Sequence, residues 1–152
     1  MTPSPAATLP VPAPAPVRPS AAVSVQVQAL SLAEPLPGFP GHRDYVLVPA
    51  EDGGRLFWLQ SVAPDGPRFL AVPAAAYFPS YAPALPGAVC VELGLTDPAQ
   101  ARLFCIVTVP DGDVTAATAN LRAPVVVNPA THRARQVVLL DAALPIRGAL
   151  RR

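Results

Sequence analysis

Proline constrains the folding of this chain more than any other residue type, because it occupies 22 of the 152 positions. Proline lacks a backbone amide hydrogen and clashes with the preceding turn of a helix, so a segment that it interrupts cannot form a long helix. Hydrophobic residues still make up 51% of the chain and charged residues only 14%, a composition that favours a packed core. At this length we expect one folded domain without long helices.

The prolines are densest at the start of the chain. Residues 1–20 contain seven of them, mixed mainly with alanine, valine, serine and threonine. Such a segment offers little area to bury and favours an extended, polyproline-like conformation. We therefore predict a disordered Pro/Ala-rich tail over residues 1–20 and a folded domain over residues 21–150. The tail is either inert or a ligand for a proline-recognising domain.

Beyond the tail, short apolar runs bounded by turn residues are typical of β-strands. Residues 23–28 alternate apolar and polar side chains, the signature of a half-buried strand. Residues 103–109 (LFCIVTV) are apolar on both faces and indicate a central strand that is buried on both sides. Further strands are expected at residues 45–48, 56–60, 69–72, 124–127 and 136–140.

The connections between these runs support the same fold class. The EDGG and APDGP segments that precede and follow residues 56–60 suggest two hairpins. Residues 74–77 could form one helical turn, and residues 88–93 either a short helix or a strand. About eight short strands with one or two short helical turns indicate a mainly all-β domain, a small barrel or a sandwich.

The residues that usually carry catalysis or metal binding are sparse. There is no G-x-S-x-G nucleophile elbow and no glycine-rich phosphate loop, and the only histidines, His42 and His132, lie in polar turns. Asp111 and Asp113 form a pair in a turn, which the turn chemistry of Asp-Gly explains. Cys90 and Cys105 lack metal-ligand spacing, and we expect them to be reduced, buried thiols. We predict no catalytic, cofactor-binding or metal site, and a surface that binds partners.

Charge and hydropathy restrict the partners and the location. The formal net charge is +1, and the eleven basic residues are arginines interspersed with acids, which disfavours direct nucleic-acid binding. Residues 1–17 carry no arginine or lysine and are broken by prolines, unlike a secretory signal. Residues 69–91 are uncharged, but four prolines interrupt them, so we expect no membrane span. We predict a cytoplasmic protein.

Several motifs occur in an order and spacing that is characteristic of one family. They are LPGF at 36–39, FWLQS at 57–61, YFPSY at 77–81, IVTVP at 106–110, TANLRAPVVVNP at 118–129 and ARQVVL at 134–139. From about Val23 to Leu150 the chain resembles the flagellar assembly factor FliW family. The resemblance implies a cytoplasmic, non-enzymatic, β-barrel-like monomer without a cofactor. It also implies competing binding of unexported flagellin and of the RNA-binding repressor CsrA, so that free protein relieves the block on flagellin translation.

Within these motifs, seven residues are candidates for contact with a partner: Trp58, Gln60, Tyr81, Thr118, Asn120, Asn128 and Arg135. Trp58 could belong to the core or anchor a partner. Asn120 and Asn128 could hold turns or contact a partner. Two features depart from the family: the tail, and residues 82–95, where Glu92 stands alone and relatives tend to have an acidic helical turn. The second departure weakens the expected electrostatic contribution to CsrA binding.

Two other classes of function remain open from the residues alone. A small barrel of this size could bind a flavin-type cofactor, as a binding protein or an enzyme. It could also bind nucleic acid through stacked aromatic side chains, although the scattered arginines argue against this.

Overall fold

The computed structural model describes residues 27–150, so the tail predicted over residues 1–20 lies outside the described part of the chain. The strands are β1 (Gln28–Leu32), β2 (Asp44–Pro49), β3 (Phe57–Ser61), β4 (Arg68–Pro73), β5 (Arg102–Thr108), β6 (Thr118–Ala119), β7 (Val125–Asn128), β8 (Arg133–Gln136) and β9 (Gly148–Ala149). The helices are α1 (Ala74–Tyr77) and α2 (Gly87–Leu93), with three 3₁₀ turns, η1 (Pro98–Gln100), η2 (Pro110–Gly112) and η3 (Val114–Ala116).

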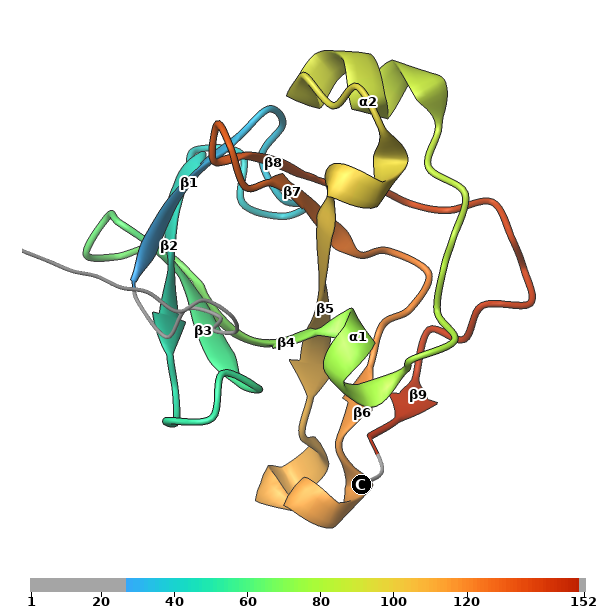
Figure 1. Ribbon diagram of the computed structural model, residues 1–152. Coiled ribbons are helices and arrows are strands. Elements are labelled where there is room, and N and C mark those ends of the chain that lie inside the picture. Colours follow the sequence, from blue (N-terminus) through green and yellow to red (C-terminus); the bar gives the residue numbers. More distant parts are fainter. Residues whose placement is uncertain (1–26, 151–152) are drawn as a thin grey trace, which may run out of the picture.

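Seven of the strands close into a barrel (Figure 1). The strand order is β4-β3-β2-β1-β8-β7-β5, and a further pairing of β4 with β5 joins the two ends of this row. All neighbouring pairs are antiparallel except β1 and β8, which run parallel. The short strands β6 and β9 extend the sheet outward from β5. The prediction of a mainly all-β, barrel-like domain with short helical turns is confirmed.

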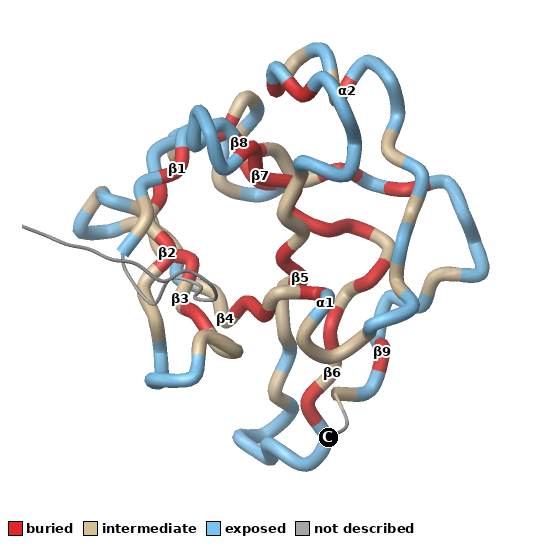
Figure 2. Tube along the Cα trace, in the orientation of Figure 1, coloured by how far each residue is buried: buried red, intermediate tan, exposed pale blue. Residues whose placement is uncertain are grey.

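The barrel interior holds the main hydrophobic core. Along β1, β2 and β3, residues that point inward and are buried alternate with more exposed residues, whereas all four residues of β7 are buried (Figure 2). The interior side chains include Leu30, Leu32, Leu36, Tyr45, Leu47, Phe57, Leu59, Ala71, Phe104, Val125, Val127 and Ala134. Phe57 and Phe104 meet edge to face across the interior, with ring centroids 5.7 Å apart. A ring of strands this small is therefore filled by its own side chains.

Two further apolar clusters lie outside the barrel wall, under the helices. Val89 and Leu93 of α2 pack on Val126 of β7, and Ala74 of α1 packs near Val72 and Cys105. The strand β5 therefore has Phe104 in the barrel interior and the neighbouring Cys105 in the outer cluster, which confirms a strand buried on both sides. Helix α2 starts after Pro86 and ends at Gly94, whose φ of 74° is the left-handed conformation that glycine adopts most easily.

Most strand predictions are confirmed, and two need correction. β1 begins at Gln28, at the end of the strand predicted over 23–28, and residues 23–26 lie outside the described residues. The strand predicted over 136–140 is wrong, because the ladder strand β8 is Arg133–Gln136. β8 has β7 on one side and β1 on the other, whereas the chain after Gln136 pairs, among residues 27–150, only on the β7 side.

The structure also shows which conformation residues 88–93 adopt and how far each cysteine is buried. The segment predicted as either helix or strand is helix α2, and Ala74–Tyr77 forms the expected helical turn. Both thiols are free, as expected, but only Cys105 is fully buried; Cys90 is half-buried and packs against the apolar cluster under α2. Within residues 27–150 no helix is long and apolar enough to cross a membrane.

Two tyrosine hydroxyls, that of buried Tyr45 and that of half-buried Tyr81, give a test of polar burial. Tyr45 Oη lies in the barrel interior with no hydrogen-bond partner among the described residues, whereas Tyr81 Oη donates to Leu121 O at 2.6 Å. We expect Tyr45→Phe to leave the free energy of unfolding unchanged or raise it by about 1 kcal/mol, and Tyr81→Phe to lower it by about 1 kcal/mol. Urea unfolding of the two variants measures both values. Equal losses of stability would contradict this assignment.

Cys105 gives a second test of the outer cluster. Burial raises the pKa of its thiol from 9.0 to about 12. A native-state thiol-labelling assay at pH 8 should therefore modify Cys90 and leave Cys105 protected until the protein unfolds. The unfolded state loses this proton at lower pH than the folded state, so stability should fall as pH rises from about 9 to 12. Cys105→Ala, which cannot ionise, should weaken this pH dependence.

Candidate functional site

Trp58 and Gln60 lie on the outer face of the barrel. Their neighbours in β3, Phe57 and Leu59, point into the core, so alternation directs Trp58 and Gln60 outward, and both are half-buried. The guanidinium carbon of Arg68 stacks 4.1 Å from the centre of the Trp58 ring. In Figure 1 both helices lie on the other side of the barrel, toward β5 and β7.

The sheet around Trp58 supplies further apolar surface. Trp58 pairs with Val48 of β2 and with Leu70 of β4, and all three side chains are half-buried. Gln60 lies in the adjacent row, between Val46 and Arg68. We call the outward side chains of Val46, Val48, Trp58, Gln60, Arg68 and Leu70 the outer β2–β4 face. It offers an aromatic ring with apolar neighbours and two polar groups at one end, which is the composition of a protein-binding patch.

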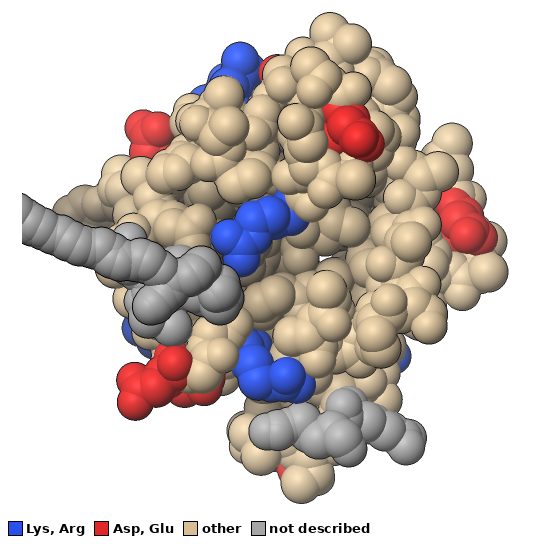
Figure 3. Space-filling view, in the orientation of Figure 1, with Lys and Arg blue, Asp and Glu red and all other residues tan. Residues whose placement is uncertain are grey.

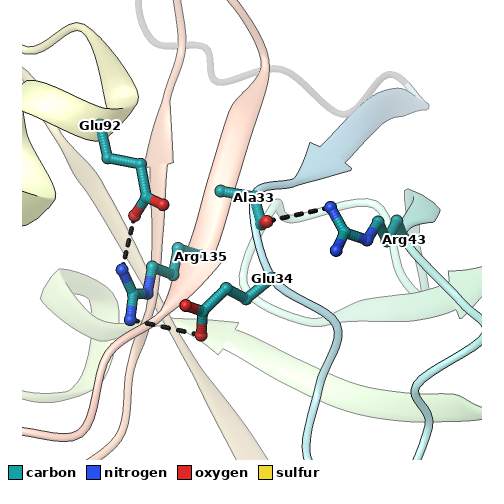
Figure 4. Close-up of polar contacts among 5 residues, drawn as sticks. All are labelled: Ala33, Glu34, Arg43, Glu92 and Arg135. Carbon is teal, nitrogen blue, oxygen red and sulfur yellow. Dashed lines mark hydrogen bonds and ion pairs between the residues drawn. The ribbon is translucent and has the colours of Figure 1, made fainter.

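Arg135 joins three parts of the chain, as Figure 4 shows. Its Nη1 donates to Glu92 Oε1 of α2 at 2.6 Å, and its Nη2 lies 3.3 Å from Glu34 Oε1, in the segment after β1. The hydrogen bond that Arg135 donates to Glu92, together with the charges of Glu92 and Glu34, raises the pKa of Arg135. The Arg135 side chain is 28% exposed, so solvent screens its ion pairs with Glu92 and Glu34. These pairs therefore add little to the free energy of unfolding, and their main effect is to position α2. Nearby, Arg43 Nη1 donates to Ala33 O at 3.2 Å.

Asn128 is buried at the end of β7, only 4% exposed. Its Nδ2 donates to Leu93 O at 2.7 Å, at the C-terminal end of α2, and its Oδ1 accepts from the amide of Ala130 at 2.9 Å. Both polar groups of the amide are therefore used inside the chain. Asn128 ties α2 to the barrel wall and holds the turn between β7 and β8.

The remaining three candidates surround β6 and α1. Asn120 Oδ1 accepts from the amides of Arg122 and Ala123, at 3.0 and 3.1 Å, and so holds a turn. Tyr81 lies in the outer cluster under α1, with its hydroxyl on Leu121 O. Thr118 is half-buried in β6, between Thr108 and Ala149. The seven predicted residues therefore lie in three separate places and do not form one site.

No cluster for metal or nucleophilic chemistry is found within the described residues. No group of three or more His, Cys, Asp or Glu side chains there could hold a metal ion. His42 Nδ1 lies 3.0 Å from Ser61 Oγ at a hairpin, and Asp113 accepts from the amide and hydroxyl of Thr115 in a turn. The turn role expected for Asp113 agrees with these bonds.

Comparison with known proteins identifies the family. The family model described as "FliW protein" matches residues 19–150. The chain belongs to the FliW family. It is 36% identical over 110 residues to the flagellar assembly factor FliW of Moorella thermoacetica, covering 72% of this chain and 70% of that protein. It is 41% identical over 118 residues to the FliW of Bdellovibrio bacteriovorus, covering 78% and 67%.

A solved structure agrees with this assignment. A crystal structure of the flagellar assembly factor FliW superposes with a TM-score of 0.71 at 28% identity, covering 80% of this chain and 84% of that one. The FliW resemblance expected from the motifs is therefore confirmed, and the fold of this FliW-family chain with it. These relatives are named as flagellar assembly factors rather than as enzymes.

Sequence reasoning missed Glu34 and Leu93. Glu34 is 59% exposed and stands in a proline-rich turn, so nothing local indicates that it meets Arg135. The Leu93 carbonyl is a backbone group, which no side-chain pattern marks. The one available signal was Glu92, the only charged residue of segment 82–95, and Arg135 is its partner in the structure.

Asn128 gives a test that separates anchoring from partner contact. Asn128→Ala removes the bond to Leu93 O and the bond from Ala130, and we expect it to lower the free energy of unfolding by about 2 kcal/mol. Asn128→Asp keeps an acceptor for Ala130 but places a carboxylate against Leu93 O, so it should be destabilised as well. Chemical denaturation measures both variants. Wild-type stability in both would show that the amide does not anchor α2.

Proposed function

We propose that this FliW-family chain is a cytoplasmic, non-enzymatic regulator that binds unexported flagellin and the translational repressor CsrA in competition. When flagellin is exported, free protein captures CsrA, and translation of flagellin resumes. Family membership across the whole barrel is the observation that supports this proposal.

The outer β2–β4 face is the proposed contact for one of these partners. Binding energy at protein interfaces is concentrated in a few buried aromatic and arginine side chains. Trp58 and Arg68 are already stacked 4.1 Å apart, so a partner would meet a pre-organised anchor with little loss of side-chain entropy. Gln60, next to Arg68 in the sheet, adds a hydrogen-bonding amide at the rim.

Arg135 belongs to a second proposed contact region, next to α2. Its charge is already shared between Glu92 and Glu34, so it offers a partner little free positive charge. The charged groups on the visible face of Figure 3 are likewise separated by uncharged surface. CsrA binding by this chain should therefore depend on apolar contacts more than on charge, and direct RNA contact has no basic stripe to support it.

Competition between the two partners requires a coupling between their sites. If the sites overlap, each partner excludes the other; if they are separate, binding at one must lower the affinity at the other, and the effect is reciprocal. The side chains of Tyr81, Asn120 and Asn128 are hydrogen-bonded within the chain, and Thr118 is half-buried in β6. We propose that they position those surfaces instead of contacting a partner.

The experiment measures binding of the purified full chain to flagellin and to CsrA by titration calorimetry, and then adds the second partner. We expect binding of each, displacement of one by the other, and a loss of affinity of about tenfold or more for at least one partner in Trp58→Ala. Val114→Ala, at a residue that is 74% exposed on η3 and outside both proposed contact regions, is the matched control and should bind like wild type.

Two results would count against the proposal. Binding of neither flagellin nor CsrA by the wild-type chain would reject the function itself. Wild-type affinities in a folded Trp58→Ala would reject the outer β2–β4 face while leaving the function standing. A yellow chromophore that copurifies with the chain would favour the flavin-binding alternative.

A further inference from the structure

The apolar side chains of the outer β2–β4 face are left out of the packing of the described chain. Val46, Val48, Trp58 and Leu70 belong to none of the three apolar clusters that residues 27–150 form. Both helices cover the opposite side of the barrel, toward β5 and β7 (Figure 1). A contiguous apolar surface of this kind, with an aromatic ring at its centre, marks a place where another segment binds.

The described chain begins at the edge of this face. Gln28 of β1 pairs with Leu47 of β2. One further step of the same antiparallel register places Val27 beside Val48, and Val27 is 60% exposed. Neighbouring strands are about 4.8 Å apart, so Trp58, two strands away from β1, lies about 10 Å from the point where the preceding residues join the barrel.

The residues before Val27 have a composition that suits this face. Residues 1–26 contain a single charged residue, Arg18, and residues 9–17 read LPVPAPAPV, with proline at every second position. Such a repeat favours an extended, polyproline conformation, so it loses little conformational entropy when it binds. Proline-rich segments bind aromatic surfaces in this conformation. The nine residues 18–26 span up to about 30 Å when extended, which is enough to bring the repeat across the face.

We propose that residues 9–17 dock on the outer β2–β4 face of the same molecule, with their proline rings packed against Trp58 and its neighbours Val48 and Leu70. A segment tethered this closely has an effective concentration on the order of 1 mM, so a contact too weak to hold a free peptide is still about half formed. The contact is intramolecular and agrees with the monomer that the family resemblance implies.

The charges of the two surfaces are compatible with this contact. Arg68, stacked on Trp58, is the charged residue of the face, and the uncharged proline repeat brings no second cation against it. Arg18 stands directly after the repeat, within reach of the exposed Glu51 and Asp52 in the hairpin that follows β2. A surface pair of this kind adds little affinity, and its effect is to favour one direction of the docked segment.

Docking of the repeat would regulate access to Trp58. A partner that uses Trp58 as its anchor has to displace residues 9–17, and a half-docked repeat lowers its apparent affinity by about twofold. This consequence rests on the proposed function. The contact between the repeat and the face does not rest on it, so the two can be tested separately.

Trp58 is the only tryptophan of the chain, so its fluorescence reports on this face alone. We expect acrylamide to quench Trp58 about 1.5-fold or more strongly when the repeat is removed from an otherwise full chain, because the docked prolines no longer shield the ring. The repeat is removed by four joint substitutions: Pro10→Ser, Pro12→Ser, Pro14→Ser and Pro16→Ser. The matched control, Ala6→Ser with Ala7→Ser, changes residues outside the repeat and should be quenched like wild type. Equal quenching of the wild type and the fourfold variant overturns the proposal.

A spin label tests where the repeat lies. In a full chain with Cys90→Ser, Ala13→Cys carries a nitroxide, while Cys105 is buried and stays unlabelled. We expect the label to broaden the NMR amide signals of Val48, Trp58 and Leu70 most strongly, and the four proline substitutions to remove this effect. Broadening that only decays with distance from Val27, or that is strongest at another surface, overturns the proposal. Both measurements contain neither flagellin nor CsrA, so their outcome is independent of the proposed function.

Discussion

The pairing of β4 with β5 is the constraint on which the rest of this structure depends. It joins Arg68–Pro73 to Arg102–Thr108 and converts an open row of strands into a closed ring of seven. Closure excludes water from the interior and removes the two sheet edges that β4 and β5 would otherwise expose. It also buries both faces of β5, because Phe104 enters the barrel and Cys105 enters the outer cluster under α1.

The fold could be predicted from the sequence where local pattern and tertiary contact agree. Short apolar runs between turn residues gave β2, β3, β4, β5 and β7, because each of these strands buries at least one face. β8 was missed because Arg133–Gln136 contains two arginines and a glutamine. It is a strand because β7 and β1 supply partners on both sides, and those partners are distant in the sequence. The more strand-like residues 136–140 have a partner on one side only.

The residues of the candidate site also divide into those whose placement a local sequence pattern predicts and those whose contacts depend on the fold. The outward direction of Trp58 and Gln60 follows from alternation with Phe57 and Leu59, and the structure agrees. The bond from Asn128 to Leu93 O and the pairing of Arg135 with Glu34 join residues far apart in the chain, and no local pattern specifies such contacts. Sequence therefore identified polar residues of interest, and only the fold separates those that hold the scaffold from those that face solvent.

Proline also limits how far the strand pairing extends. Pro35 and Pro37 have no amide hydrogen, so the pairing of β1 with β8 does not continue beyond Ala33, although the chain after β8 stays extended to Leu140. The residue type that prevents long helices therefore also sets the length of the ladder that β1 and β8 share. Because the formal net charge is only +1, we expect apolar contact to be the main source of affinity for a partner.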